Sequence, residues 1–302
     1  MTPDFFLIGA PKCGTSALYD YLSDHASCCL PQNKEPHFFA EDMYVRETGL
    51  SRRVKDPDRY AAHFEGCAPG ALTGEGSTWY LYSQVAVPKI EATGRVPKYI
   101  VMLRNPVEAA QSLHRHHVRK LYDDAEDFST AWDLNETRAA GAQLPHHCPD
   151  PKMLDYRAAY SFAPQLRRLL TKVPRERVLI HIYEEFFSDP ATGYARTLDF
   201  LGLPQDGRSE FGTVNPNRSL RNKTLYRLLT YKPFPLNLVY PAAKRVANAL
   251  GLRPGQAVFE RNVRVEKRMP LDPETRRRVK DAFRQDIAET EDILGRTLEC
   301  WS

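Results

Sequence analysis

The sequence lacks any apolar run of about 20 residues, the length that a helix needs to cross a bilayer. Its first ten residues, MTPDFFLIGA, have neither the basic start nor the apolar core of a signal peptide. We therefore expect no transmembrane segment, and we interpret these residues as a buried strand that starts almost at the terminus. Internal repeats and low-complexity tracts are also missing, so one domain with long functional loops, spanning residues 1–302, is the simplest prediction.

A strong excess of charge of either sign is absent as well. The net charge of +4 is too small to hold a nucleic acid by bulk attraction, so any anion site must be built locally. Aromatic residues at 11% and charged residues at 26% are ordinary for a soluble globular protein, which argues against a disordered or fibrous chain.

The cysteines show no regular spacing and no C-x-x-C pair. We therefore expect neither a disulfide framework nor a zinc site, but reduced thiols in a cytoplasm. Cys148 follows His146 and His147, but without a second ligand cluster we predict no metal there. The six cysteines are Cys13, Cys28, Cys29, Cys67, Cys148 and Cys300.

Short β-branched or aromatic runs alternate with amphipathic helical patterns, which predicts an α/β fold with a central parallel sheet flanked by helices. The strand runs are almost continuously apolar, as expected of strands covered on both faces. The predicted strands are 4–10, 71–77, 98–105 and 177–184. The predicted helices are 15–25, 106–120 with Asn105 as N-cap and Pro106 at its first position, 190–202 and 272–295.

Three segments carry weaker patterns. Residues 121–153 are polar and contain LPHHCPDP, so we expect a mobile excursion from the core. Residues 203–222 are rich in turn residues and basic near their end. Residues 231–251 are apolar and punctuated by proline; packing as core is the favoured interpretation, and covering an extended acceptor or docking a partner are the alternatives.

The stretch FFLIGAPKCGTSAL resembles a phosphate-binding loop with its lysine displaced. Gly9 and Gly14 have the spacing of G-x-x-x-x-G-K-[ST], but Thr15 and Ser16 follow Gly14 directly and Lys12 lies inside the loop. A strand, a glycine turn and a helix aim amide groups and the helix dipole at one spot, which favours an anion. Without lysine after the second glycine, a nucleoside triphosphate fits less well than a shorter diphosphate-like group such as phosphosulfate. The alternative is a tight turn with an incidental lysine.

A second motif, YIVMLRNPVEAAQSLHRHH, ends a hydrophobic strand with Arg104. Open α/β sheets bind ligands at this end of their strands. Ser112 lies two turns into the following helix, with Arg115 and Arg119 near the same face, so arginine and serine could clamp a second phosphate. Taken alone, the motif is better explained by a solvated basic helix; beside the first loop, ligand binding is favoured.

A third motif, NKEPHFFAED, places Glu35 about 20 residues after the loop. Because Pro36 follows, we expect an extended backbone at Glu35. An acid beside Lys34 and His37 in an aromatic setting could act as a general base. A surface turn with an ion pair is the alternative.

Together these stretches resemble the sulfotransferases that use 3′-phosphoadenosine 5′-phosphosulfate (PAPS). APKCGTSAL is similar to their 5′-phosphosulfate loop, and LRNPVEAAQS to their 3′-phosphate motif. Residues 177–204 and the tail LDPETRRRVKDAFRQDIAETEDILGRTLECW are similar to the late strand–helix unit and to the ends of bacterial members. The motif KEPHFF is closest to the heparan sulfate sulfotransferase branch. The resemblance covers residues 5 to 301 with gaps in the loops.

The resemblance implies roles for individual residues. Glu35 would be the catalytic base, accompanied by His37, and Lys12 would bind the phosphosulfate and stabilise charge on its bridging oxygen. Arg104 and Ser112 would hold the 3′-phosphate. The 5′ cradle would consist of Lys12, Cys13, Gly14, Thr15, Ser16 and Ala17. The regions closing over the nucleotide would contribute Tyr183, Arg218, Arg221, Asn222 and Lys223.

Two departures from the family pattern matter. Heparan-type enzymes commonly have a lysine in the motif that here reads GEGSTWYLY, where Gly76 stands instead. This weakens a glycosaminoglycan assignment, because a charge facing the sulfate is lost. The membrane anchor of the Golgi enzymes is also missing, which fits a bacterial cytoplasmic protein, with peripheral membrane contact left open.

The predicted reaction is sulfuryl transfer from PAPS, without a metal, to a hydroxyl or less readily an amine of a carbohydrate, glycolipid or other small molecule. One rival is a small-molecule kinase with an altered loop, and another is a non-catalytic nucleotide-binding protein. The acceptor pocket would be built from loops 38–70, 121–153 and 224–260. Trp79 and Tyr80 could line it or serve as core aromatics.

Overall fold

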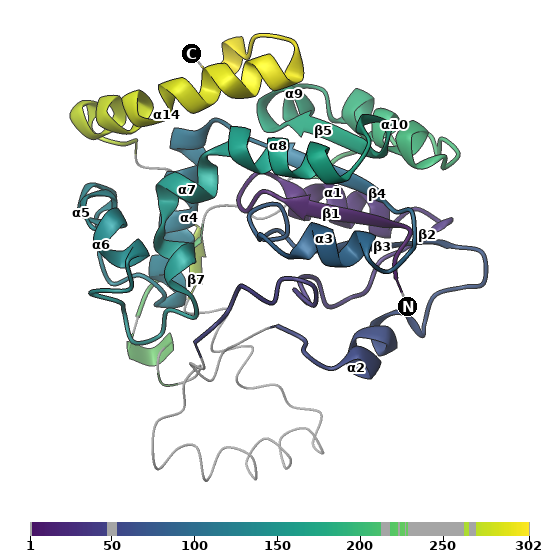
Figure 1. The fold of residues 1–302 in the computed structure, drawn as a ribbon, viewed down its shortest axis with the longest axis horizontal. Coiled ribbons are helices and arrows are strands. Elements are labelled where there is room, and N and C mark those ends of the chain that lie inside the picture. The colour runs from purple at the N-terminus through teal and green to yellow at the C-terminus, as the bar shows by residue number, and fades with distance from the viewer. Residues whose placement is uncertain are drawn as a thin grey trace.

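The computed structural model describes residues 2–46, 53–212, 218–222, 224–226, 228, 263–265 and 270–301. Its centre is a five-stranded sheet in the order β2-β3-β1-β4-β5, in which every pair of neighbours is parallel (Figure 1). The strands are β1 (Phe5–Gly9), β2 (Cys28–Cys29), β3 (Leu72–Gly76), β4 (Lys98–Leu103) and β5 (Val178–Ile182). A separate antiparallel pair joins β6 (Arg218–Leu220) to β7 (Val263–Val265). The predicted parallel α/β sheet is confirmed.

Helices cover both faces of the sheet, which explains why its central strands are apolar throughout. On one face α3 (Ala86–Glu91) contacts α8 (Phe162–Lys172), and both lie in front of the strands in Figure 1. On the other face α1 (Thr15–Ser23) meets α10 (Pro190–Leu201), where the rings of Tyr21 and Tyr194 pack edge to face. The long helix α14 (Pro273–Leu294) lies across α8 and α4 (Pro106–Lys120).

The predicted helices begin where their capping residues indicated. The Asn105 side chain accepts from the amide of Val107 ahead of α4, and Asp189 and Asp272 cap α10 and α14 in the same way, each followed by proline. The remaining helical segments are α2 (Pro57–Ala61), η1 (Ala62–Phe64), α5 (Phe128–Asp133), α6 (Asn135–Ala139), η2 (Pro151–Leu154), α7 (Tyr156–Tyr160), η3 (Arg175–Arg177), α9 (Tyr183–Ser188) and η4 (Glu299–Trp301).

The expectation of a mobile excursion over residues 121–153 is wrong. This segment contains α5, α6 and most of η2, and a buried ionic network ties it to the core. The Arg138 guanidinium, only 2% exposed, donates to Asp123 at 2.6 Å, and the Tyr156 hydroxyl donates to the other oxygen of Asp123 at 2.6 Å. Composition could not reveal this, because the partners are brought together by long-range packing.

The expectation that all thiols are reduced is also wrong. Cys29, at the end of β2, forms a disulfide with Cys67, which follows η1. The other four thiols are free; Cys300 is exposed and the rest are buried. Their spacing in the sequence gave no sign of this pairing, because a disulfide requires close approach of two Cα atoms, here 5.6 Å, rather than a particular separation along the chain.

Two properties of the described part of the chain bear on membranes and metals. None of its helices is long and apolar enough to cross a membrane. It contains no group of three or more histidine, cysteine or acidic side chains that could hold a metal ion, and Cys148 instead donates its thiol proton to the carbonyl of Asp150. The apolar segment 231–251 lies outside the described residues.

The strand order defines where a ligand should bind. From β1 the chain continues to β2 and β3 on one side of the sheet, whereas β4 and β5 lie on the other side. The topological switch point therefore lies between β1 and β4, and ligands of open α/β sheets bind at the carboxyl ends of the strands there. In this sheet those ends carry the loop 10–14 and Arg104.

Candidate active site

The loop between β1 and α1 forms an anion site from backbone groups. The amide of Ala10 donates to the carbonyl of Met102 on β4 at 2.7 Å, which holds the loop at the switch point. Lys12 and Gly14 both have left-handed backbones, with φ of 62° and 89°. Gly14 caps α1 without a side-chain hydrogen bond, and no acidic residue lies in the first turn. The positive end of α1 and its first amides are thus left for an anionic ligand.

Arg104 joins this loop to the end of β4. Its guanidinium donates to the carbonyl of Lys12 at 3.3 Å and lies over the ring of Tyr183, 4.3 Å from the ring centre. Arg104 is only 9% exposed, and its buried Nε has no hydrogen-bond partner. A buried donor without a partner costs free energy, so a ligand oxygen at this place would be stabilised. The predicted convergence of Lys12 and Arg104 is thus present in the structure.

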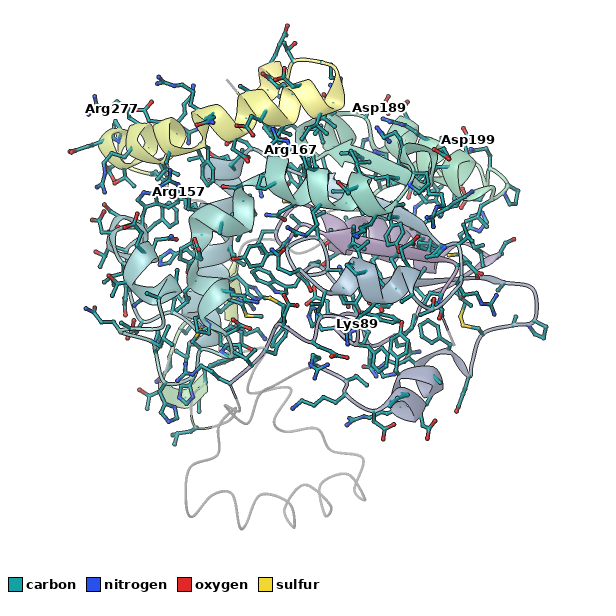
Figure 2. The ribbon with its side chains drawn as sticks, in the orientation of Figure 1. Lys89, Arg157, Arg167, Asp189, Asp199 and Arg277 are labelled. Atoms are coloured by element: carbon teal, nitrogen blue, oxygen red, sulfur yellow. A yellow bond between two sulfur atoms is a disulfide. The ribbon has the colours of Figure 1, made fainter. Side chains whose placement is uncertain are left out.

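Charge is concentrated around the Lys12 amine. Burial lowers the pKa of Lys12 to about 8, and the positive charges of Arg119 and Arg104 act in the same direction, while Glu35 opposes them. Arg119 also donates to His116 at 3.1 Å. By contrast, side chains such as Arg277 on α14 and Asp199 on α10 project into solvent at the edge of the molecule (Figure 2). The site therefore gathers partly desolvated positive charge, which favours a polyanion.

Glu35 lies at the carboxyl end of β3. Its amide donates to the carbonyl of Gly76 at 3.0 Å, and its carboxylate accepts from the Thr78 hydroxyl at 3.2 Å. The backbone is not extended as we expected from the proline that follows: φ is 66°, in the left-handed region. The strand edge holds the segment in this unusual conformation, which overrides the local preference. Strain of this kind costs about 1–3 kcal/mol and gathers at functional sites.

The carboxylate of Glu35 is kept ionised by its neighbours. Burial alone would raise its pKa, but the nearby imidazole of His37, the charge of Lys34 and the Thr78 hydroxyl bring it down to about 2. His37 Nε2 is 3.6 Å from a Glu35 oxygen. The side chain of Glu35 is 33% exposed, so a substrate hydroxyl can reach it.

His37 is fully buried and belongs to the support of Glu35. Its Nε2 is 2.9 Å from the hydroxyl of Tyr44, its amide donates to the Ser77 hydroxyl at 3.0 Å, and its φ is 51°. The imidazole has no exposed surface and lies beside Glu35, where it can orient the carboxylate. The role predicted for His37 as a catalytic residue stays a prediction, and its burial favours positioning of Glu35.

The other predicted donor-site residues differ in whether their side chains are available to a ligand. Ser112 lies half-buried in the second turn of α4. The Cys13 thiol is buried and donates to the carbonyl of Pro11, so Cys13 would contribute its backbone only. Ala17 is likewise buried within α1. Thr15 and Ser16, in contrast, present hydroxyls at the start of α1, where both accept from the amine of Lys34.

Few of the predicted residues that close over the nucleotide can be placed. Arg221 and Asn222 are exposed, and the Asn222 side chain accepts from the amide of Leu225 at 2.8 Å. Arg218 starts β6, of which only the backbone is described. Lys223 lies outside the described residues. The contribution of all four to nucleotide binding stays a prediction.

Several site residues were not predicted. Ser77 and Thr78 support His37 and Glu35, and Tyr44 contacts His37. Ser77 and Thr78 directly follow β3, and the rule that strand ends meet at one edge could have found them. Trp79 and Tyr80, left open as cleft or core, are core aromatics at 4% and 0% exposure.

The fold and this site define a class of protein. The switch point of the parallel sheet carries an amide-lined loop, a loop lysine and an arginine whose Nε has no partner, an arrangement suited to a nucleotide-like polyanion, and the carboxylate of Glu35 lies nearby. Comparison with known proteins identifies the family: the model of the sulfotransferase domain matches residues 2–290. The chain belongs to the sulfotransferase domain family.

Individual relatives agree with this membership. The chain is 29% identical over 205 residues to mouse heparan sulfate glucosamine 3-O-sulfotransferase 6, covering 67% of this chain and 52% of the relative. It is 27% identical over 223 residues to human bifunctional heparan sulfate N-deacetylase/N-sulfotransferase 3, covering 72% of this chain and 24% of the relative. The chain thus spans about half or less of the length of these relatives.

Among solved structures, a sulfotransferase from Alicyclobacillus acidocaldarius is similar over the whole chain. It superposes with a TM-score of 0.73 at 25% sequence identity, covering 100% of this chain and 99% of the other. The arrangement of strands and helices described above is therefore one that a solved bacterial sulfotransferase shares.

Proposed function

We propose that this protein transfers a sulfuryl group from PAPS to a hydroxyl group of a saccharide or saccharide-bearing acceptor. The observation that carries the proposal is the convergence of Lys12, Arg104 and Glu35 at the carboxyl edge of the sheet. Lys12 and Arg104 are linked by a hydrogen bond, and Glu35 is close enough to act on the pKa of Lys12. Cations for a doubly phosphorylated donor and a base for an acceptor thus share one site.

The residues suggest how the reaction would proceed. The 5′-phosphosulfate would lie on the loop and the start of α1, while Arg104 and Ser112 would hold the 3′-phosphate. The acceptor oxygen would attack the sulfur in line and form a new O–S bond, as the bond from sulfur to the bridging oxygen breaks. The bond electrons would stay on the 5′-phosphate of 3′,5′-ADP, where the Lys12 ammonium stabilises the developing charge.

Glu35 would receive the proton of the acceptor hydroxyl. Its pKa of about 2 means that it is ionised at any pH where the protein works, so it is always able to accept. Its hydrogen bond from Thr78 and its contact with His37 fix the carboxylate in one orientation. A low pKa makes a weak base, but sulfuryl transfer needs the proton only as the O–S bond forms.

The acceptor class rests on the relatives. Mouse heparan sulfate glucosamine 3-O-sulfotransferase 6 is named for transfer to a saccharide hydroxyl, whereas human bifunctional heparan sulfate N-deacetylase/N-sulfotransferase 3 is named for transfer to nitrogen. We favour oxygen, because a carboxylate base is needed to deprotonate a neutral hydroxyl as it attacks. A cytoplasmic location, predicted from the sequence, stays part of this proposal and would be checked by fractionation.

Two assays test the proposal. Calorimetric titration with 3′,5′-ADP should show binding to the wild-type protein and loss of binding in Lys12→Met. Transfer of label from PAPS to a panel of oligosaccharides should then proceed in excess chelator, since lysine, hydroxyls and helix dipole supply the positive charge. Binding of 3′,5′-ADP without transfer to any acceptor would favour a binding protein, and chelator-sensitive turnover of ATP would favour a kinase.

A further inference from the structure

Lys34 directly precedes Glu35, but its side chain reaches the end of the loop of residues 10–14, which we call the donor loop. Its amine lies 3.1 Å from the hydroxyl of Ser16 and 3.4 Å from that of Thr15, the first two residues of α1. The ammonium of lysine can only donate, so both hydroxyl oxygens must accept from it. The hydroxyl protons are then directed elsewhere, and the open side of the first turn is where a ligand oxygen would accept them.

The position of this amine is unfavourable without a ligand. The start of α1 carries the positive end of the helix dipole, and neither a capping side chain nor an acidic residue in the first turn offsets it. Burial lowers the pKa of Lys34, while the charges of Glu35 and Asp20 act in the opposite direction. A cation placed at a positive helix end is destabilising until an anion arrives between them.

Neighbouring residues leave space for the side chain of Lys34 and hold it. A Cβ atom at Gly76 would lie 2.7 Å from the ring of Tyr19 and 3.3 Å from Lys34 Cε. The Lys34 amine is 5.3 Å from the centre of the Tyr19 ring, whose hydroxyl donates to the carbonyl of Pro31. A larger residue at position 76 would therefore push Tyr19 and Lys34 away from the start of α1.

We propose that Lys34 is a positioning residue of the donor site, which orients the Thr15 and Ser16 hydroxyls towards the 5′-phosphosulfate and adds a positive charge on that side of the loop. This inference rests on the proposed function. It assigns the amine to the 5′ end of the donor, while Arg104 serves the 3′-phosphate. Lys34 therefore discriminates between nucleotides that carry a 5′ anion and those that do not.

The test compares Lys34→Met and Lys34→Arg with the wild type by calorimetry and thermal unfolding. Lys34→Met should weaken binding of 3′,5′-ADP by about 10- to 100-fold, the range for a lost charge-assisted hydrogen bond. Binding of adenosine 3′-monophosphate, which lacks the 5′ group, should stay unchanged. Without nucleotide, Lys34→Met should melt at the same or a higher temperature than the wild type. Lys34→Arg should recover most of the affinity. Lys89→Met removes a lysine that pairs with Glu41 at the surface and serves as control.

The outcomes separate this inference from the proposed function. If Lys34→Met binds 3′,5′-ADP as well as the wild type does, or loses both nucleotides equally, the role of Lys34 is overturned while sulfuryl transfer stands. A marked drop in the melting temperature of nucleotide-free Lys34→Met would also overturn it, because that result assigns Lys34 to the fold. Failure of the wild type to bind 3′,5′-ADP at all would instead overturn the proposed function.

Discussion

The guanidinium of Arg104 lies 4.3 Å from the centre of the Tyr183 ring and donates to the carbonyl of Lys12. These two contacts join the ends of β4 and β5 to the loop after β1. The stacked ring restricts the rotation of the guanidinium, and the buried Nε stays without a protein partner. Arginine is thus held ready to form two parallel hydrogen bonds to a phosphate, a geometry that lysine cannot copy.

We predict that Arg104→Lys weakens binding of 3′,5′-ADP by about 10- to 100-fold, since it removes the paired hydrogen bonds. Binding of 5′-AMP, which has no 3′-phosphate, should change little. The measurement is calorimetric titration with both nucleotides. Arg177→Lys is the control, because Arg177 pairs with Glu91 next to the amino end of β5. An equal loss for the two nucleotides would contradict the assignment of Arg104 to the 3′-phosphate.

The Lys12 amine should couple donor binding to proton uptake. Burial, with the charges of Arg119 and Arg104, lowers the pKa of Lys12 to about 8, so the free protein loses this charge as the pH rises above 8. A bound anion stabilises the ammonium and raises its pKa again. We predict that affinity for 3′,5′-ADP falls by up to about tenfold per pH unit as the pH rises above 8.

Calorimetry in two buffers of different ionisation enthalpy measures the coupling. At pH 8.5 (about half a unit above the Lys12 pKa) binding should take up most of one proton. Lys12→Arg keeps its charge throughout and should show no uptake. Absence of proton uptake in the wild type would contradict this coupling, because the amine would then have the same protonation state in the free and the bound protein.

Replacement of Glu35 should separate catalysis from binding. Glu35→Gln keeps the size of the side chain but cannot accept a proton, so we predict a loss of about 10²- to 10⁴-fold in kcat, with little change in affinity for PAPS. Because neighbours hold the pKa of Glu35 at about 2, the carboxylate contributes no loss of activity as the pH falls from 7 to 4.

The predicted loss of kcat without a loss of affinity for PAPS is measured by a pH profile of kcat and a binding titration of Glu35→Gln. Glu41→Gln is the matched control, since Glu41 is a half-exposed glutamate that pairs with Lys89. Equal losses of affinity and kcat in Glu35→Gln would remove Glu35 from the role of base. An acid limb near pH 5 that is present in the wild type and missing in the variant would instead contradict the low pKa of Glu35, because it would assign that titration to its carboxylate.

The disulfide between Cys29 and Cys67 should stabilise the edge of the sheet. It closes a loop with a sequence separation of 38, so its removal should lower the free energy of unfolding by about 2–4 kcal/mol. Denaturant unfolding of the double variant Cys29→Ser, Cys67→Ser measures this, and reduction of the wild type should give the same loss. Cys300→Ser, which removes an exposed free thiol, should have no effect. An unchanged midpoint in the double variant would show that the bond does not form in solution.

The sequence was sufficient for those features that depend on local signals. The strands β1, β4 and β5 were found because each is a nearly continuous apolar run, and α4 because Asn105 and Pro106 mark its start. The strand β3 was also predicted, whereas the short strands β2, β6 and β7 were not. The pairing of Lys12 with Arg104 could also be predicted, because it needs only the rule that parallel strands end at one edge. In each case the information lies within a few residues of the element concerned.

The features that were missed depend on contacts between distant segments. The left-handed backbone of Glu35 is imposed by its bond to Gly76, against the preference of a residue before proline. The Asp123–Arg138 pair orders a segment whose composition looked like a loop. The position of the Lys34 amine at the start of α1 requires the small residue at Gly76 and the ring of Tyr19. No local pattern encodes these arrangements.

Gly14 is closely packed against aromatic rings at the end of the donor loop. A Cβ atom there would lie 2.5 Å from the Phe187 ring and 3.0 Å from that of Tyr183, and its φ of 89° is unfavourable for any other residue. Gly14→Ala should therefore destabilise the protein by about 1–3 kcal/mol and displace Tyr183 from beneath Arg104. Affinity for 3′,5′-ADP should fall with it, as measured by calorimetry.

The double variant Gly14→Ala, Phe187→Leu separates the collision of the new Cβ atom from the cost of the left-handed backbone. Leucine shortens the side chain and relieves the collision, but the left-handed backbone at position 14 keeps its cost. If collision dominates, the pair recovers most of the affinity for 3′,5′-ADP that Gly14→Ala loses, because Tyr183 can return beneath Arg104. If the backbone dominates, the pair stays as weak as Gly14→Ala, since the first amides of α1 then point away from the ligand. Full affinity in Gly14→Ala alone would contradict both, and would mean that the donor does not contact this turn.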